Sequence, residues 1–288
     1  MTAVTTTVTL ESPTVAPPRS GTGRLAAVAT LARRRLAISA RTPRELLVPL
    51  SAPLLFALVV IPALADTFGA AVAGVDYMTF VAVATIGLLV PLSCMQSGLG
   101  VVVDRLGGGL RDLLAAPVSR PLIVAGNLAV AVGIASLHVA VLLGASALRG
   151  AHYELSATGL GWFAAATLGF TVAMYGAAEV LANRLPTQEE YIGALPPVAI
   201  VPFFFAGSFF PISALPAGLT VIGKLLPITH LLALVRYGLA GDGGAGLRDI
   251  WGMSDTTAMA VLSLGVIGLF AAALTATAVR TFRRTAVR

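Results

Sequence analysis

Few side chains in this sequence could carry out bond chemistry. The three histidines are His138, His152 and His230, the single cysteine is Cys94, and Glu179 is the only acid inside a long apolar stretch. A metal-dependent or nucleophilic enzyme needs clustered carboxylates, histidines at ligand spacing, or a nucleophile beside a base. These residues do not supply such a cluster, and a lone cysteine supports neither a disulfide framework nor a cysteine metal site. The sequence therefore argues against an enzyme.

ATP hydrolysis is also unsupported on this chain. A phosphate-binding loop has the form GxxxxGK[ST], in which backbone N–H groups and a lysine hold the phosphates. The single lysine, Lys224, lies in the context GKLLP, which does not fit that form. We therefore expect no catalytic site, metal or small cofactor on this chain.

A stripe of polar and small residues runs along one apolar stretch. Ser93, Gln96, Ser97 and Gly100 follow one side of a predicted helix. Such residues either let helices pack closely or line the path of a transported molecule. Both interpretations stay open at the level of the sequence.

His138 and Glu179 are two further interior candidates. His138 follows Asn127 by eleven residues, which puts both on one helix face about 16 Å apart. It is either a hydrogen-bonded interior histidine or part of a substrate or proton path. Glu179 lies one turn beyond Tyr175, and ionisable residues within a membrane span are functional candidates. Because Arg184 follows soon after, we favour a Glu179 side chain that extends to the membrane interface.

The elements that carry these residues are predicted to be transmembrane helices. Hydrophobic residues make up 57% of the 288 residues and charged residues 11%, which is more apolar surface than one soluble core buries. A transmembrane helix needs about 20 apolar residues. Six charge-free stretches meet that length: 46–65, 77–103, 121–148, 155–178, 191–223 and 256–279. The predicted fold is all-α, with six transmembrane helices and both termini on one side.

The basic residues divide unequally between the two sides, and positive charge favours cytoplasmic loops. Fifteen of the nineteen fall on one side: Arg19, Arg24, Arg33, Arg34, Arg35, Arg41, Arg44, Arg105, Arg111, Arg120, Arg184, Arg280, Arg283, Arg284 and Arg288. The loop 66–76 on the other side has no lysine or arginine. We therefore expect a multi-pass protein of the bacterial plasma membrane with both termini in the cytoplasm. Its positive charge suits membrane lipids with anionic headgroups, and nucleic acid is not expected as a partner.

The first 41 residues precede the spans. Residues 1–21 are rich in Thr, Val and Pro, and we expect a disordered cytoplasmic tail. In 22–41, Leu25, Val28 and Leu36 share one stripe with arginines opposite, which predicts an amphipathic helix in the headgroup plane. It is an anchor, a docking site for a cytoplasmic partner, or both. Residues 22–288 are predicted to form a single transmembrane domain.

The loop after the second span predicts a short amphipathic helix. The glycines 107–109 end the span because glycine lowers helix propensity, and Pro117 ends the next helical turns. Between them three leucines share one face, and two charged residues lie opposite: Leu110, Leu113, Leu114, Arg111 and Asp112. A helix of about seven residues is marginal in water. It therefore needs a groove, either on its own bundle or on a partner.

The segment 203–241 predicts a broken helical hairpin. The charge-free stretch 191–223 is longer than one span needs and shorter than the roughly 40 residues that two require. Lys224 and Arg236 bracket only eleven residues, and each would cost about 2.5–3.5 kcal/mol deep in the bilayer. We expect a fifth span that ends near Phe209 and a hairpin that re-enters the outer leaflet, where His230 and Arg236 could face each other.

In these two places the sequence resembles the type-2 permeases of ATP-binding-cassette exporters, the family that includes the daunorubicin-resistance membrane proteins. The first motif is matched at Asp104, Arg105, Gly108, Leu110, Leu113, Leu114, Pro117, Val118, Ser119, Arg120 and Gly126. Leu106 and Gly107 replace charged residues of the motif, Gly109 replaces threonine and Asn127 replaces lysine. The second motif is matched at Gly207, Phe210, Pro211, Leu215, Pro216, Pro227 and Arg236. The similar region covers roughly residues 22–284.

The resemblance implies roles and partners. The loop helix, with Asp104, Arg105 and Arg111, would be the coupling helix that touches an ATPase subunit, and the second motif would form re-entrant helices near the outer exit. The implied partners are two ATP-binding-cassette ATPase subunits, which hold ATP and magnesium, and a second permease chain, identical or homologous. The implied function is ATP-driven export of a hydrophobic compound, either a lipid or a drug-like molecule, as in multidrug efflux and antibiotic resistance. A lipid-modifying membrane enzyme and a non-transporting accessory membrane protein are the alternatives.

Overall fold

The computed structural model describes residues 50–68, 74–109 and 119–285, together with seven positions between 23 and 33. Several predictions lie outside these residues: the tail 1–21, most of the amphipathic helix 22–41, and the coupling-helix residues Leu110, Arg111, Leu113, Leu114 and Pro117. The described residues form the transmembrane bundle and the ends of its helices.

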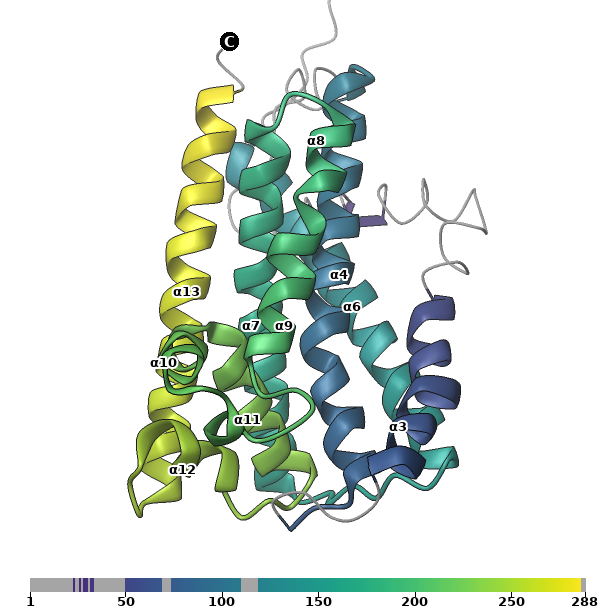
Figure 1. Ribbon diagram of the computed structural model, residues 1–288. Helices are drawn as coiled ribbons and strands as arrows, with labels where there is room; N and C mark the ends of the chain where they lie inside the picture. Colours follow the sequence, from purple (N-terminus) through teal and green to yellow (C-terminus); the bar gives the residue numbers. More distant parts are fainter. Residues whose placement is uncertain are drawn as a thin grey trace, which may run out of the picture.

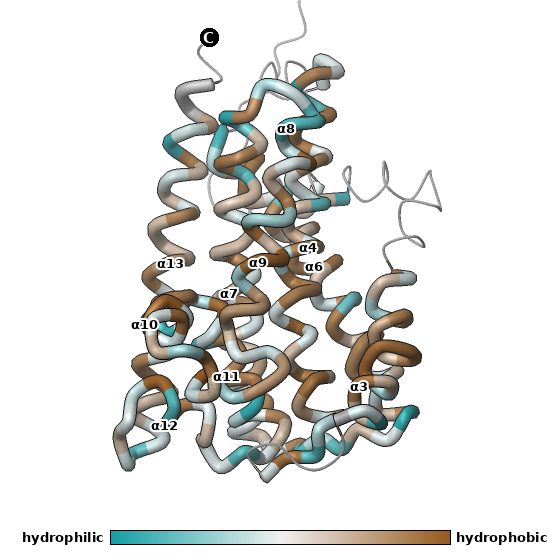
Figure 2. Tube along the Cα trace, viewed as in Figure 1, coloured by the Kyte–Doolittle hydropathy of each residue, from teal (hydrophilic) through white to brown (hydrophobic). Residues whose placement is uncertain are grey.

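Five helical segments are long and apolar enough to cross a membrane. The first is Leu50–Thr67, which includes the π-helical turn η1 (Phe56–Val60) and most of α3 (Ile61–Phe68). The others are α4 (Tyr77–Leu106), α6 (Arg120–Leu148), α7 (Ala157–Arg184) and α13 (Thr256–Thr285). Figure 2 shows hydrophobic residues along the middle of the bundle and hydrophilic residues gathered toward its two ends. These segments confirm five of the six predicted spans in type and approximate position.

The predicted fifth span is not one long helix. It is built from α8 (Gln188–Gly193), the π-helical turn η2 (Pro196–Ile200) and α9 (Val201–Phe205). Prolines 196, 197 and 202 lack the N–H that a regular helix needs, which explains the interruption. The segment ends at Phe205, four residues before the predicted end near Phe209, and it is not among the five long helices.

Four short helices follow α9 and gather at one end of the bundle (Figure 1). They are η3 (Ile212–Ala214), α10 (Ala217–Leu225), α11 (Pro227–Leu239) and α12 (Ala245–Trp251). Pro211 directly precedes η3, Pro216 directly precedes α10, and Pro227 begins α11. The axes of α10 and α11 differ by 82°, so the pair is either a sixth, broken span or a re-entrant element.

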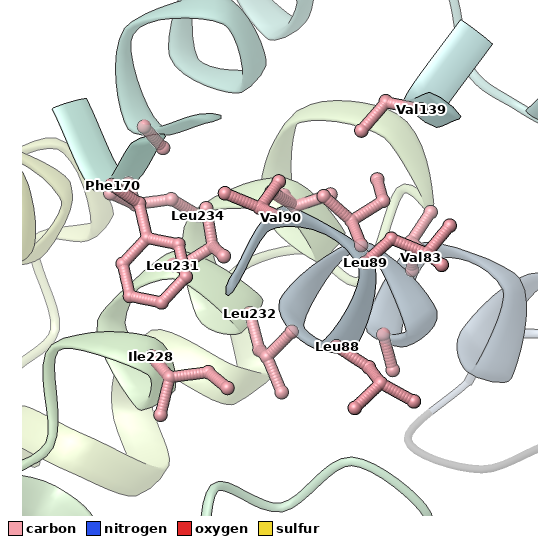
Figure 3. Close-up of a cluster of buried hydrophobic side chains, with 14 of the residues drawn as sticks. Val83, Leu88, Leu89, Val90, Val139, Phe170, Ile228, Leu231, Leu232 and Leu234 are labelled. Carbon is pink, nitrogen blue, oxygen red and sulfur yellow. The ribbon is translucent and has the colours of Figure 1, made fainter. Parts of the chain in front are cut away.

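Helix α4 occupies the centre of the bundle. In its most apolar window 89% of the residues are buried, against 28% for α13. It packs against α6, α7 and α11. Figure 3 shows Leu88 and Val90 of α4 beside Leu232 and Leu234 of α11. The core of the molecule therefore forms around the second span.

Glycines allow α7 to approach two neighbours at backbone distance. A Cβ on Gly159 of α7 would lie 2.2 Å from the carbonyl oxygen of Gly238 in α11, and a Cβ on Gly176 would lie 2.9 Å from the backbone of Leu274 in α13. Real Cβ atoms do not approach other atoms so closely, so a larger residue would push the helices apart. Close approach through small residues is the usual way in which membrane helices pack.

Hydrogen bonds and the ribbon together define the two ends of the bundle. At one end, the backbone N–H of His152 donates to Thr79 at the start of α4, and that of Glu154 donates to Leu239 at the end of α11. At the other end, Arg105 of α4 donates to the carbonyl of Leu185, just after α7. The final turns of α13 and the start of α8 lie at this second end in Figure 1. The arrangement matches a chain that alternates in direction.

Candidate functional site

Ser93 and His138 form a buried polar contact between α4 and α6. Their side chains are 1% and 5% exposed, and Ser93 Oγ lies 2.7 Å from His138 Nδ1. Ser93 also donates to the carbonyl of Leu89, one turn earlier. The Ser93 hydroxyl has only one proton. Both bonds form together when Ser93 donates to Leu89 and His138 Nδ1 donates to Ser93 Oγ. The arrangement corresponds to the hydrogen-bonded interior histidine that was one of the two alternatives from the sequence.

The rest of the predicted polar stripe is divided. Ser97 is half-buried and donates to the carbonyl of Ser93, whereas Gln96 is exposed. Asn127 is half-buried on α6. The structure thus brings together Ser93 and His138 but places Gln96 on the surface of the bundle.

Glu179 does not extend to the interface as we expected from the sequence. Its side chain is fully buried. Tyr175 donates a hydrogen bond to Oε2 over 2.5 Å, and Asn183 donates one to Oε1 over 3.2 Å. A buried carboxylate that accepts two hydrogen bonds is stabilised where it lies and does not need to reach water. Tyr175 and Glu179, one turn apart, therefore pair on one face of α7, while Arg184 is exposed at the end of that helix.

Tyr191 of α8 is an interior residue that the sequence did not reveal. It is fully buried, and its hydroxyl donates to the carbonyl of Met95 in α4 over 2.8 Å. A Cβ on Gly98 would lie 2.2 Å from that hydroxyl, so Gly98 provides the space for the ring. The sequence placed Tyr191 only as the first residue of the predicted span 191–223, after two acidic residues, and gave no sign of its partner in α4.

Arg236 anchors the broken segment to the core. Its guanidinium is buried and donates to the carbonyls of Gly207 and Ser208 over 2.9 and 3.1 Å. The Arg236 Cζ atom lies 3.5 Å from the centre of the Phe80 ring in α4, which is a cation–π geometry. Gly207 has φ +77°, a conformation that favours glycine. Two residues of the second sequence motif, far apart in the chain, therefore meet here.

Two carboxylates share a small cavity with Arg236. The cavity has a volume of about 20 Å³, and Arg236, Asp242 and Asp249 are among its lining residues. Asp242 accepts from the backbone N–H groups of Gly244 and Gly246 before and within α12. Asp249 accepts from the hydroxyl of Ser213 in η3. The Asp249 bond joins α12 to η3, and Arg236 of α11 lines the same cavity as both carboxylates.

His230 has its own partners and does not face Arg236 as the sequence suggested. Both residues lie on α11, and His230 Nε2 lies 3.1 Å from the carbonyl oxygen of Lys224 at the end of α10. His230 Nδ1 lies 3.2 Å from Ser263 Oγ of α13, which accepts a hydrogen bond from the indole N–H of Trp251. Because His230 and Arg236 lie on the same helix, almost two turns apart, they cannot face each other across a hairpin.

The remaining residues of the second motif occupy boundaries and surfaces. Phe210 is 42% exposed and Leu215 is half-buried. Pro211, Pro216 and Pro227 stand where η3, α10 and α11 begin. The motif thus specifies turns and breaks, with Arg236 as its one buried charge.

The end of α4 that leads to the predicted coupling helix is fixed to α7. Arg105 donates to the carbonyls of Leu185 and Pro186, which follow the last turn of α7. Asp104 and Arg105 are half-buried in the last turn of α4, and the helix stops at Gly107, as predicted. These bonds satisfy carbonyls left open at a helix C-terminus.

A second cavity lies among the spanning helices and is lined by apolar residues. Its volume is about 170 Å³. The lining residues come from several segments: Pro91, Phe170, Met174, Ala177, Val198, Ala199, Pro202, Leu226, Pro227, Ile228, Phe270 and Leu274. Within residues 50–68, 74–109 and 119–285, no three His, Cys, Asp or Glu side chains are placed to hold a metal ion.

The comparison with known families agrees with the architecture. The family model described as ABC-2 type transporter matches residues 26–240, a region that includes α4, α6, α7 and the segment broken by prolines. A search of curated proteins returns no match. Membership implies an ATP-binding-cassette ATPase as partner and, typically, a dimeric arrangement of permease chains. The match covers most of the 288 residues, and the chain is therefore a member of the ABC-2 type transporter family, a multi-pass permease subunit.

Proposed function

We propose that this permease exports a hydrophobic compound, a drug-like molecule or a lipid, from the cytoplasm or the inner leaflet. The observation that carries the proposal is the family match over 26–240. Two features support the choice of cargo: an apolar lining surrounds the larger cavity between the spans, and the residues around the broken segment are mainly apolar. ATP hydrolysis takes place on separate ATPase subunits with magnesium, and two permease chains pair.

Three parts of the chain have assigned roles in this proposal. The loop helix with Leu110, Leu113 and Leu114 couples to the ATPase, and Arg105, beside Asp104 in the last turn of α4, bonds that turn to the end of α7. The hairpin α10–α11 re-enters the outer leaflet, because its 82° bend lets both arms stay on one side. The arginines beside the loop helix favour the cytoplasm for this end, since positive charge is favoured there.

Transport is tested with the assembled complex in inverted membrane vesicles. An exporter moves cargo into the lumen of such vesicles, so addition of ATP and magnesium should drive accumulation of the lipophilic dye rhodamine 6G. A complex whose ATPase subunit carries an inactive phosphate-binding loop is the control. Accumulation that occurs only in right-side-out vesicles would mean that the permease imports the dye. Accumulation without ATP would also contradict the proposal.

The coupling role is tested by replacing Leu113 and Leu114 with Asp. A leucine side chain that leaves water on binding contributes about 1.5–3 kcal/mol, so the double variant should lose most of the copurified ATPase. Leu155→Asp is the matched control, because Leu155 is 73% exposed in the segment between α6 and α7 at the opposite end. Equal ATPase recovery from both variants would remove the loop from the coupling role.

A further inference from the structure

The larger apolar cavity lies where three breaks in helical backbone meet. Pro91 interrupts the hydrogen-bond ladder of α4, Val198 and Ala199 belong to the π-helical turn η2, and Leu226 and Pro227 form the bend between α10 and α11. Irregular backbone of this kind is costly within a membrane and gathers at functional positions. The cavity is thus framed by three separate interruptions, each specified by proline.

The lining residues of this cavity could not hold a polar ligand. Each is alanine, proline or a larger aliphatic, sulfur-containing or aromatic residue. An apolar cavity of roughly 150 Å³ stays dry and takes up molecules the size of benzene. The volume here is about 170 Å³. A dry cavity of this size accommodates a ring or a short length of hydrocarbon chain.

The cavity has a mouth on the outside of the bundle. Phe270 of α13 is exposed, and Leu274 and Pro202 at the rim are half-buried. The neighbouring surface is apolar, with Val201 46% and Leu225 70% exposed. Where no second chain covers it, such a surface of a membrane protein is in contact with lipid hydrocarbon. Figure 3 shows Phe170 and Ile228, two of the lining residues, within the buried cluster that forms the inner wall.

We propose that this cavity is a binding site for an uncharged hydrocarbon group that enters from the bilayer. The source is either the acyl tail of a membrane lipid or the apolar part of the cargo. The Leu226–Ile228 wall makes the bend between α10 and α11 part of the site, so an occupant contacts the broken hairpin directly. The inference depends on membrane insertion alone and goes beyond the proposed export function.

Photolabelling tests the site with the full chain in vesicles of phosphatidylcholine and phosphatidylglycerol. Part of the phosphatidylcholine carries a diazirine on its acyl chain, and adducts are located by mass spectrometry after digestion. We expect adducts in the peptides that contain Met174 and Phe270. Ala177→Phe fills the cavity and should lower these adducts by about tenfold, the change that about 1.4 kcal/mol produces. Ala140→Phe at an exposed position of α6 is the matched control and should leave them unchanged.

A second variant is expected to raise the labelling, so that a loss of labelling caused by misfolding of the first variant is recognised. Phe270→Ala widens the mouth without filling the interior, so adducts at Met174 should increase. Unchanged adducts in both Ala177→Phe and Phe270→Ala would overturn the proposal, as would adducts confined to exposed faces away from the cavity, such as that of Leu137 on α6. Ala177→Phe is uninformative if it does not elute as a monodisperse protein in size-exclusion chromatography. In that case, unchanged Met174 labelling in Phe270→Ala alone overturns the proposal.

Competition separates the two sources of the hydrocarbon group. Naphthalene, an uncharged ring compound, serves as the competitor: lower Met174 adducts at constant lipid indicate a site open to the apolar part of a cargo molecule, whereas unchanged adducts indicate a lipid tail as the occupant. Both results support the site. Failure of dye accumulation in the transport assay, with labelling intact, would contradict the export function and leave this site in place.

Discussion

Single side chains in this permease act mostly by joining segments that are distant in sequence. Arg236 connects α11 to the turn at 207–208 and to Phe80 of α4. Tyr191 connects α8 to the backbone of α4 beside Gly98. Each contact is buried, so removing one partner leaves the other partner's polar group inside the bundle without a hydrogen bond and away from water.

Removal of the Arg236 charge should destabilise the protein. Arg236→Met leaves the carbonyls of Gly207 and Ser208 without their donor, and a hydrogen bond to a charged group contributes about 1.5–3 kcal/mol. The melting temperature of the detergent-solubilised permease should fall clearly. Arg248→Met is the matched control, because Arg248 is exposed and donates only to the carbonyl of Gly243 in the described structure. Equal melting temperatures for the two variants would show that Arg236 is not an anchor.

Gly98 should not tolerate a methyl group. In Gly98→Ala the new Cβ would lie 2.2 Å from the Tyr191 hydroxyl and 3.0 Å from Ala178 Cβ, so α8 must move away from α4. Overpacking of this kind typically costs about 1–3 kcal/mol. Thermal unfolding should show a loss for Gly98→Ala and partial recovery in the double variant with Tyr191→Phe. Gly133→Ala has open space around its Cβ, and a similar loss there would argue against a specific conflict.

At the scale of elements, the bend between α10 and α11 explains how a helical pair turns inside an apolar region. Helix C-termini leave carbonyls without partners. At the end of α10, Thr229 donates to Gly223 over 2.6 Å, and His230 Nε2 bonds Lys224. Both side chains come from the first turn of α11. The bend is therefore closed by the helix that follows it.

Loss of one of these caps should loosen α10. Thr229→Val keeps the shape of the side chain and removes the hydroxyl that donates to Gly223. Hydrogen exchange followed by mass spectrometry should then be faster in the peptide 217–225 than in the wild type. Thr277→Val is the control, because the hydroxyl of Thr277 is exposed and donates to the carbonyl of Ala273 one turn earlier. Unchanged exchange in 217–225 would mean that Thr229 does not hold the bend.

The sequence predicted the elements better than their contacts. Charge-free stretches located the long helices, and prolines at 211, 216 and 227 located the breaks, because length and missing N–H groups are local properties. The π-helical turn η2 and the buried environment of Glu179 were not predicted. Both depend on which helix faces which, and helices that are apolar all round give no periodic signal for orientation. His138 gained a partner 45 residues away, which no spacing rule indicates.

At the scale of the whole molecule, the arrangement gives a testable orientation. The basic ends of α4, α7 and α13 lie together, and α10–α12 lie toward the opposite end with the end of α3 (Figure 1). Under the positive-inside rule the first end faces the cytoplasm. Thr67 at the end of α3 and Lys224 at the end of α10 should then both be reached from outside.

Cysteine labelling in intact cells tests this orientation. In a Cys94→Ser background, single cysteines at Thr67 and Lys224 should react with an impermeant thiol reagent, while one at Arg184 should react only after the membrane is opened. Thr67 and Arg184 are exposed, so access depends on the side of the membrane. A cysteine at Lys224 that reacts only from the cytoplasm would mean that α10 and α11 together cross the membrane.

The central position of α4 also has a consequence for biosynthesis. It is the second span to leave the ribosome, yet α7 and α11, against which it packs, are made only later, at residues 157–184 and 227–239. Its apolar composition allows it to enter lipid before those partners exist. Assembly must then exchange lipid for protein around α4 after insertion. Packing around α4 therefore lags behind its insertion, and the neighbours of α4 are complete only after residue 239 has emerged.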